Sequence, residues 1–117
     1  MKVLVCGGRT YQDYDKVKQE LDQLHEVYTI TKIISGHARG ADSLGERWAK
    51  ENEVPLEIYP AEWDKYGKSA GHQRNYKMLI EGLPDTVIAF PGGPGTKNML
   101  KQARTLNTTV ETIIEVS

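Results

Sequence analysis

The glycines Gly92, Gly93 and Gly95 carry the clearest chemical signal, because they follow the apolar run 86–90 and precede a segment of helical spacing. A residue without a Cβ can adopt φ > 0 and lets the main chain approach a ligand closely. The unpaired amides at the start of a helix favour anions. Pro94 has no N–H, so the loop offers a restricted set of donors. This order of strand, glycine turn and helix predicts a phosphate-binding loop.

Two other pairs of glycines follow apolar runs in the same way. Gly7 and Gly8 form the first pair, and Gly36 and Gly40 form the second. Turns that follow parallel strands all lie at the carboxyl edge of their sheet, where α/β proteins bind ligands. We therefore expect the three turns to converge on one site.

Three arginines accompany these turns. Arg9 and Arg39 lie within the turns themselves, whereas Arg74 and Asn75 fall on the inward face of an expected helix. An inward arginine needs an anion for its fork of donors. A bound phosphate or carboxylate would supply that anion, and a salt bridge to an acid such as Asp42 is the alternative.

Asp42 and two histidines are further candidates. Asp42 either stabilises the start of a helix or accepts a hydrogen bond from a ribose hydroxyl or a base. His37 and His72 are candidate proton donors or ligand contacts. No set of Cys, His or carboxylate residues has the spacing of metal ligands, so we expect no metal and no cofactor.

Apolar runs of strand length alternate with segments of helical spacing along the whole chain. Strands alternating with helices indicate a parallel sheet covered on both faces. The prediction is a single α/β domain over residues 1–117, a Rossmann-like three-layer sandwich with a mainly parallel five-stranded sheet. Strands are expected at about 3–6, 32–36, 56–59, 86–90 and 110–116, and helices at about 14–28, 41–52, 69–80 and 94–106, with a loop around Trp63 and Tyr66.

Length and charge exclude several classes of protein. A chain of 117 residues fits one domain with one core. Its 15 basic and 16 acidic residues give a net charge of −1, which offers no field to attract nucleic acid or an anionic membrane. The single cysteine, Cys6, excludes an internal disulfide and suits a reducing compartment. No apolar stretch approaches the roughly 20 residues of a membrane helix, so we expect a cytoplasmic protein.

Three segments resemble the motifs of a known superfamily. Residues 35–42, Ser-Gly-His-Ala-Arg-Gly-Ala-Asp, resemble the signature of the DNA-processing protein DprA. Residues 71–78 resemble the Met-His-x-Arg-Lys-x-x-Met segment of the cytokinin-activating LOG enzymes. Residues 91–96 resemble the start of their loop Pro-Gly-Gly-x-Gly-Thr-x-x-Glu. The combination resembles the SLOG superfamily, and specifically its small YspA-type, YpsA-related branch.

The resemblance implies a nucleotide or nucleotide-like ligand, with its phosphate on the loop 91–96 and Arg74 near the ribose. LOG enzymes cleave the N-glycosidic bond of a nucleoside 5′-monophosphate with an arginine and the glutamate that ends the loop motif. Arg74 matches that arginine, but Met99 stands at the glutamate and Asn75 at the following lysine. The predicted ligand contacts are Gly7, Gly8, Arg9, Ser35, Gly36, Arg39, Gly40, Ala41, Asp42, His72, Arg74, Asn75, Pro91, Gly92, Gly93, Gly95 and Thr96.

Because the catalytic glutamate is absent, the first hypothesis is a binding protein that senses, carries or sequesters a nucleotide or nucleotide-derived signal. The alternative is a phosphoribohydrolase in which Arg74 is catalytic and Asp42, Asp64 or Glu62 replaces the lost acid. A third hypothesis is single-stranded DNA binding of the DprA type, which the nearly neutral charge disfavours. The resemblance also implies a homo-oligomer.

Overall fold

Strands and helices alternate along the chain in the structure, a computed structural model that describes residues 1–117. The longest helix has 15 residues. None of the helices combines the length and the apolar character needed to cross a membrane. The elements in chain order are β1 (Lys2–Cys6), α1 (Tyr14–Tyr28), β2 (Lys32–Ser35), α2 (Ala41–Glu51), β3 (Leu56–Ile58), α3 (Trp63–Tyr66), the 3-10 helix η1 (Gly67–Ser69), α4 (Ala70–Ile80), β4 (Thr86–Ala89), α5 (Pro94–Thr105) and β5 (Thr112–Glu115).

The five strands form one sheet in the order β3-β2-β1-β4-β5, and all neighbouring strands run parallel. This topology confirms the predicted Rossmann-like α/β fold. The direction of strand addition reverses between β1 and β4, which pair with Val5 opposite Ile88. Ligands of such sheets bind beyond the carboxyl ends of the strands at this reversal.

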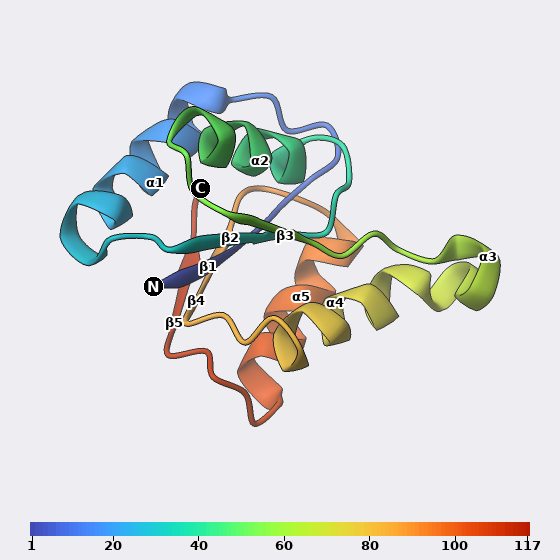
Figure 1. Cartoon of the computed structure of the whole chain (residues 1–117). Coiled ribbons are helices and arrows are strands. Elements are labelled where there is room, and N and C mark those ends of the chain that lie inside the picture. The colour runs from blue at the N-terminus through green and yellow to red at the C-terminus, as the bar shows by residue number, and fades with distance from the viewer.

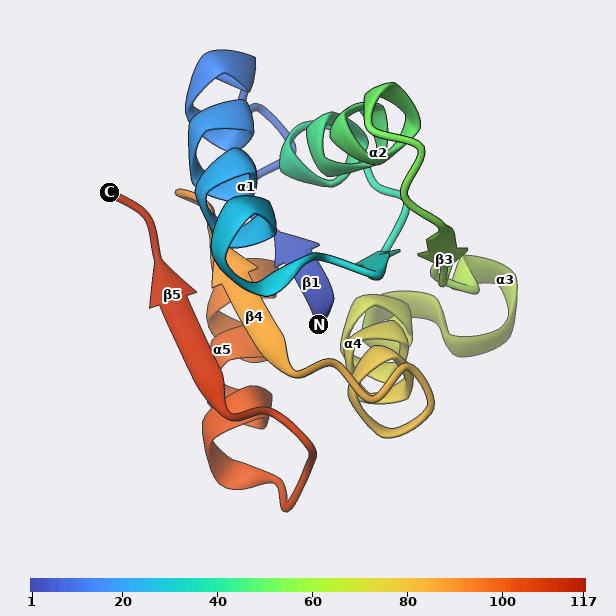
Figure 2. The same cartoon turned by 60° about the vertical axis from the view of Figure 1, so that its left-hand side comes forward.

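Helices α1 and α2 cover one face of the sheet, and α4 and α5 cover the other (Figures 1 and 2). Strand β1 contributes to both cores: Val3 and Val5 pack with α1 and α2, whereas Leu4 and Cys6 pack with α4 and α5. Successive side chains of a strand point to opposite faces, so a strand buried on both faces is apolar throughout. The central strands are therefore held rigidly from both sides.

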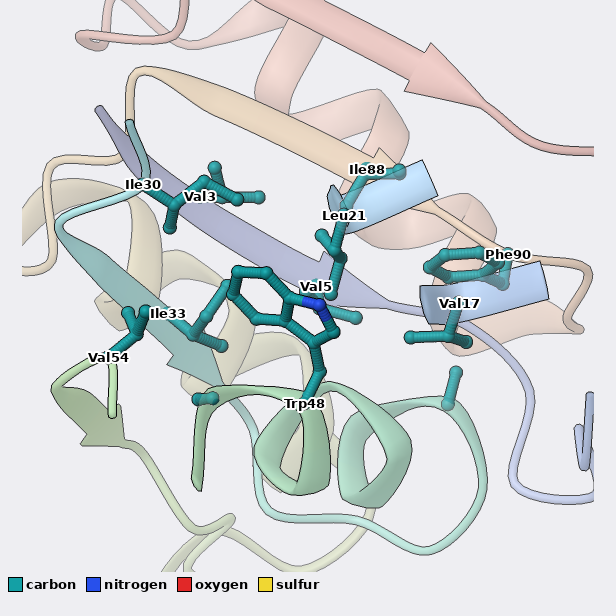
Figure 3. Packing of buried hydrophobic residues seen from close by; sticks show 12 residues of the cluster. Val3, Val5, Val17, Leu21, Ile30, Ile33, Trp48, Val54, Ile88 and Phe90 are labelled. Atoms are coloured by element: carbon teal, nitrogen blue, oxygen red, sulfur yellow. The ribbon is translucent and has the colours of Figure 1, made fainter. Parts of the chain in front are cut away.

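Trp48 is the largest fully buried side chain and joins α1, α2 and the sheet (Figure 3). Its indole Nε1 donates a hydrogen bond of 2.8 Å to Asp22 Oδ1 on α1. At the start of α1, the side chain of Asp13 accepts a hydrogen bond of 3.0 Å from the Lys16 amide. Packing and capping together fix the orientation of α1 and α2 on this face of the sheet.

Two segments differ from the sequence prediction. The expected loop around Trp63 forms the short helix α3, which continues through η1 into α4. Four residues are too few to display a helical period, so the hydrophobic pattern could not predict this helix. The last strand covers Thr112–Glu115 rather than 110–116, because it pairs only with the four residues of β4. The amides of Glu111 and Val116 still bond to Asp85 and Ala89 on either side.

Candidate functional site

A cleft of about 440 Å³ lies at the carboxyl edge of the sheet, beside the turns that follow β1 and β4. Small-molecule sites commonly measure about 300–1,000 Å³. The walls come from the β1 turn, the first turn of α2, one side of α4 and the start of α5. Trp63 and Lys68 close the outer side, where α3 extends past the ends of the strands (Figure 1).

Backbone hydrogen bonds hold the three glycine turns together. The Gly8 amide donates to the carbonyl of Pro91 over 2.9 Å, and the Gly8 carbonyl accepts from the Ala41 amide over 3.1 Å. Gly40 adopts φ +77, and a Cβ there would lie only 2.1 Å from the Gly8 carbonyl oxygen. Glycine is therefore required at position 40 both by conformation and by space. The predicted convergence of the three turns is present in the structure.

The glycines of the β4 turn serve two different purposes. A Cβ on Gly92 would lie 2.2 Å from the hydroxyl of Thr96, so this glycine is needed for packing. A Cβ on Gly93 or Gly95 would meet nothing within 4 Å, although both residues line the cleft. The amides of Gly95 and Thr96, in the first turn of α5, make no hydrogen bond within the chain. The loop thus leaves two amide donors and an open space at a helix N-terminus.

Arg74 lies on the cleft side of α4 and is held from two directions. Its Nη1 donates to the Gly36 carbonyl over 2.6 Å, and its Nε donates to Asn75 Oδ1 over 3.1 Å. The guanidinium makes no ion pair with any carboxylate, so the alternative salt bridge to Asp42 is not formed. Burial lowers the pKa of Arg74, and the nearby charge of Asp42 opposes that shift. The cleft therefore contains a fixed cation without an anionic partner.

Asn75 connects Arg74 to the glycine loop. This side chain is 5% exposed, and its Nδ2 donates to the Gly95 carbonyl over 3.2 Å and to Asn98 Oδ1 over 3.1 Å. Gln102 Nε2 donates to the same Asn98 oxygen over 2.7 Å. Because every polar atom of Asn75 is used within the protein, its role here is to position Arg74 against the start of α5.

Asp42 is the acid that lines the cleft. It is 6% exposed, and its Oδ2 accepts a hydrogen bond of 3.2 Å from the Ala38 amide. Burial raises the pKa of Asp42 to about 6, against the Ala38 hydrogen bond and the charge of Arg74, which lower it. Burial likewise raises the pKa of the Cys6 thiol beside it, so this cysteine is an unreactive part of the floor.

Cationic and aromatic groups line the rim. The Arg9 guanidinium carbon lies 5.6 Å from the ring centre of Trp63, whose side chain is half exposed. Lys68 and His72 complete this side. An exposed indole beside a cation offers a flat apolar surface next to positive charge, an arrangement that can hold a base and its phosphate.

The predicted contacts fall into three groups. Gly7, Gly8, Arg9, Asp42, His72, Arg74, Asn75, Gly93, Gly95 and Thr96 line the cleft. Gly36 and Arg39 border a neighbouring hollow. The remainder line neither space and instead join the turns together or pack in the core: Ser35, Gly40, Ala41, Pro91 and Gly92.

Ser35 is an example of a residue that lines neither space. Its hydroxyl donates to Glu46 Oε2 over 2.7 Å and accepts from the His37 amide over 3.1 Å. Glu46 is buried and also lies 3.1 Å from His37 Nδ1. His37 adopts φ +61, and these contacts hold it there. The serine therefore shapes the turn.

Sequence reasoning did not select several residues that line the cleft. Lys68 lies on η1, and the segment of α3 and η1 has no helical period in the sequence, so its position over the site was not predicted. Trp63, which its sequence position marks as an aromatic that could stack on a base, lines the cleft from α3. Met99 forms part of the floor and is 1% exposed. Its place in the apolar stripe of α5 was readable from the sequence, and the structure bears out that packing position. No group of three or more His, Cys, Asp or Glu residues is arranged to hold a metal ion.

The comparison with family models now adds to this geometry. A sequence model of the YspA, cpYpsA-related SLOG family matches residues 1–66, more than half of the chain. The chain belongs to this family. The matched SLOG segment includes the β1 turn, the β2 turn and α3, whereas α4 and the loop before α5 lie beyond it.

A curated relative extends the similarity over more of the SLOG chain. The Gene 61 protein of Mycobacterium phage D29 is 35% identical over 111 residues, which cover 88% of each protein. Its name states no activity. No solved structure matches the chain significantly.

Proposed function

We propose that this SLOG protein binds a nucleotide or nucleotide-derived ligand, with a phosphate seated between the start of α5 and Arg74. The observation that carries the proposal is a guanidinium without a carboxylate partner that lines the same cleft as two free amides. Arg74 is held by Gly36 and Asn75 but has no carboxylate partner. Gly95 and Thr96 offer amides to the same cleft. A phosphate would accept from both donors.

The rest of the cleft suits the remainder of a nucleotide. Trp63 presents a half-exposed ring at the rim, where a base would stack. Asp42 lies at the inner wall, where its carboxylate would accept from ribose hydroxyls. Family membership supports a nucleotide-related ligand at this coarse level. With Met99 where LOG enzymes carry their acid, the proposed role is sensing, carrying or sequestering the ligand.

A thermal-shift screen with nucleoside monophosphates, diphosphates and dinucleotides tests the proposal. A ligand at 100 times its Kd stabilises the folded state by about 2.7 kcal/mol. The variant Arg74→Gln should lose most of this stabilisation. Lys50 is exposed in the last turn of α2. The control variant Lys50→Gln also removes one positive charge and should keep the stabilisation by the ligand. The proposal fails if no compound raises the melting temperature, or if both variants respond as the parent does.

A second candidate function rests on Asp42. Of the three acids considered for a LOG-like hydrolase, Asp42 alone lines the cleft, whereas Glu62 and Asp64 are exposed outside it. A carboxyl group with a pKa of about 6 can donate a proton near neutral pH. If this function is present, the protein releases free base from a nucleoside 5′-monophosphate. The variant Asp42→Asn should not release it. Absence of any release with all common monophosphates would remove this candidate.

A further inference from the structure

A second hollow of about 280 Å³ adjoins the cleft. It shares Arg9, Ala38, Trp63 and Arg74 with the cleft, so the two spaces lie side by side. Arg39 lies on its outer side. A ligand that extends beyond the cleft at this side would meet the residues of the hollow.

The arginines of this chain divide sharply by location. Arg47 and Arg104, which lie away from both spaces, form ion pairs with Glu51 and Glu115. Arg9, Arg39 and Arg74 all border the hollow, and none of them forms an ion pair with a carboxylate. The protein therefore gathers its unpaired guanidinium groups at one place.

No acidic side chain lines this hollow. His37 lines the hollow beside the buried Glu46, and the Ala38 amide, which borders both spaces, donates to Asp42. Burial lowers the pKa of Arg74, the charge of Asp42 opposes that shift, and the charge of Arg9 adds to it, because Arg9 and Arg74 are like charges. A bound anion would offset their repulsion, whereas an uncharged base would not.

We propose that the hollow is a second anion subsite, so that the ligand is a nucleotide with two anionic groups, one on the α5 loop and one between Arg9 and Arg39. This inference rests on the proposed function and narrows its ligand class. Arg74, which borders both spaces, contacts the part of the ligand that joins the two groups. A nucleoside monophosphate fills only the first position.

Isothermal titration calorimetry tests the inference with three sets of probes. These are the nucleoside 5′-monophosphates, the 5′-diphosphates and the 3′,5′-bisphosphates of adenosine, guanosine, cytidine and uridine, all at one ionic strength. The measured quantity is the ratio of affinities between a doubly phosphorylated compound and its own monophosphate. A charge-assisted hydrogen bond to phosphate predicts a ratio of at least about tenfold for the best nucleoside.

Two variants assign this ratio to the hollow. Arg39 is exposed, so Arg39→Gln leaves the fold intact, and it should bring the ratio to within about threefold of one. Lys50→Gln removes the same charge elsewhere and should keep the parental ratio. Monophosphate binding with a ratio below about tenfold overturns the second subsite but leaves the proposed function standing. The second subsite is also overturned if Arg39→Gln keeps the parental ratio of affinities. If none of the probes binds, both the second subsite and the proposed function fail.

Discussion

Replacing Gly95 by alanine tests the binding site apart from the stability of the fold, because the melting temperature should rise while the affinity for nucleotides should fall. The added Cβ meets no atom of the protein within 4 Å. The residue lies in the first turn of α5, where alanine is better tolerated than glycine. The methyl group would, however, occupy the open space in front of the free amides.

The expected changes in stability and in nucleotide affinity can be estimated from this open position. A glycine replaced by alanine without strain stabilises a protein by about 0.4–1 kcal/mol. For a chain of 117 residues this raises the melting temperature by about 2–4 °C. Displacing a phosphate from one charged hydrogen bond costs about 1.5–3 kcal/mol, which weakens nucleotide affinity by about 10- to 150-fold.

Thermal unfolding without ligand and calorimetric titration with the nucleoside 5′-monophosphates measure the two effects. Thr105→Ala is the matched control, because it places an alanine at the exposed end of the same helix, far from the cleft. The control should bind the monophosphates as the parent does. Unchanged monophosphate affinity in Gly95→Ala would refute the reasoning, since the methyl group could not then share its space with a phosphate.

Four further changes test neighbouring parts of the account. Because the pKa of Asp42 is raised, the folded state binds this proton more tightly than the unfolded state. The free energy of unfolding should therefore fall by up to about 3 kcal/mol as the pH rises from about 4 through 6. In urea unfolding, the free energy of unfolding of Asp42→Asn minus that of the parent should increase as the pH rises over that range. A difference that stays constant with pH would contradict the raised pKa. Gly36→Ala places a Cβ 2.5 Å from Arg74 Nη1, so it should displace the guanidinium from the Gly36 carbonyl and weaken nucleotide binding in calorimetric titration by about tenfold. Asn75→Ala leaves buried partners unpaired and should cost about 1–3 kcal/mol in urea unfolding as well as affinity. Cys6 should react with a thiol reagent only after unfolding, because it is buried and the pKa of its thiol is raised; rapid reaction of the native protein would contradict its place in the floor.

The sheet and the location of the cleft were predictable because they depend on local signals. Alternating periods along the chain indicated a parallel sheet, and the glycine turns marked its carboxyl edge. The inward position of Arg74 could be read from its spacing to Met78 on α4, since that spacing places both on one face. The residues at 93 and 95 followed from the strand, turn and helix order.

Other features depend on contacts between distant residues, which a single sequence does not reveal. The role of Asn75 arises from its bonds to Gly95 and Asn98 on another helix. Ser35 looked like a ligand contact, but the buried Glu46 eleven residues later occupies its hydroxyl. The division of the arginines into paired and unpaired groups also became visible only when their carboxylate neighbours were known.

A crystal structure of the protein with the best-binding nucleotide tests the central claim most directly. We predict density for a phosphate within hydrogen-bonding distance of the Gly95 and Thr96 amides and of the Arg74 guanidinium. Density for the nucleotide at another surface, with the Arg74 guanidinium still bonded only to Gly36 and Asn75, would contradict the account.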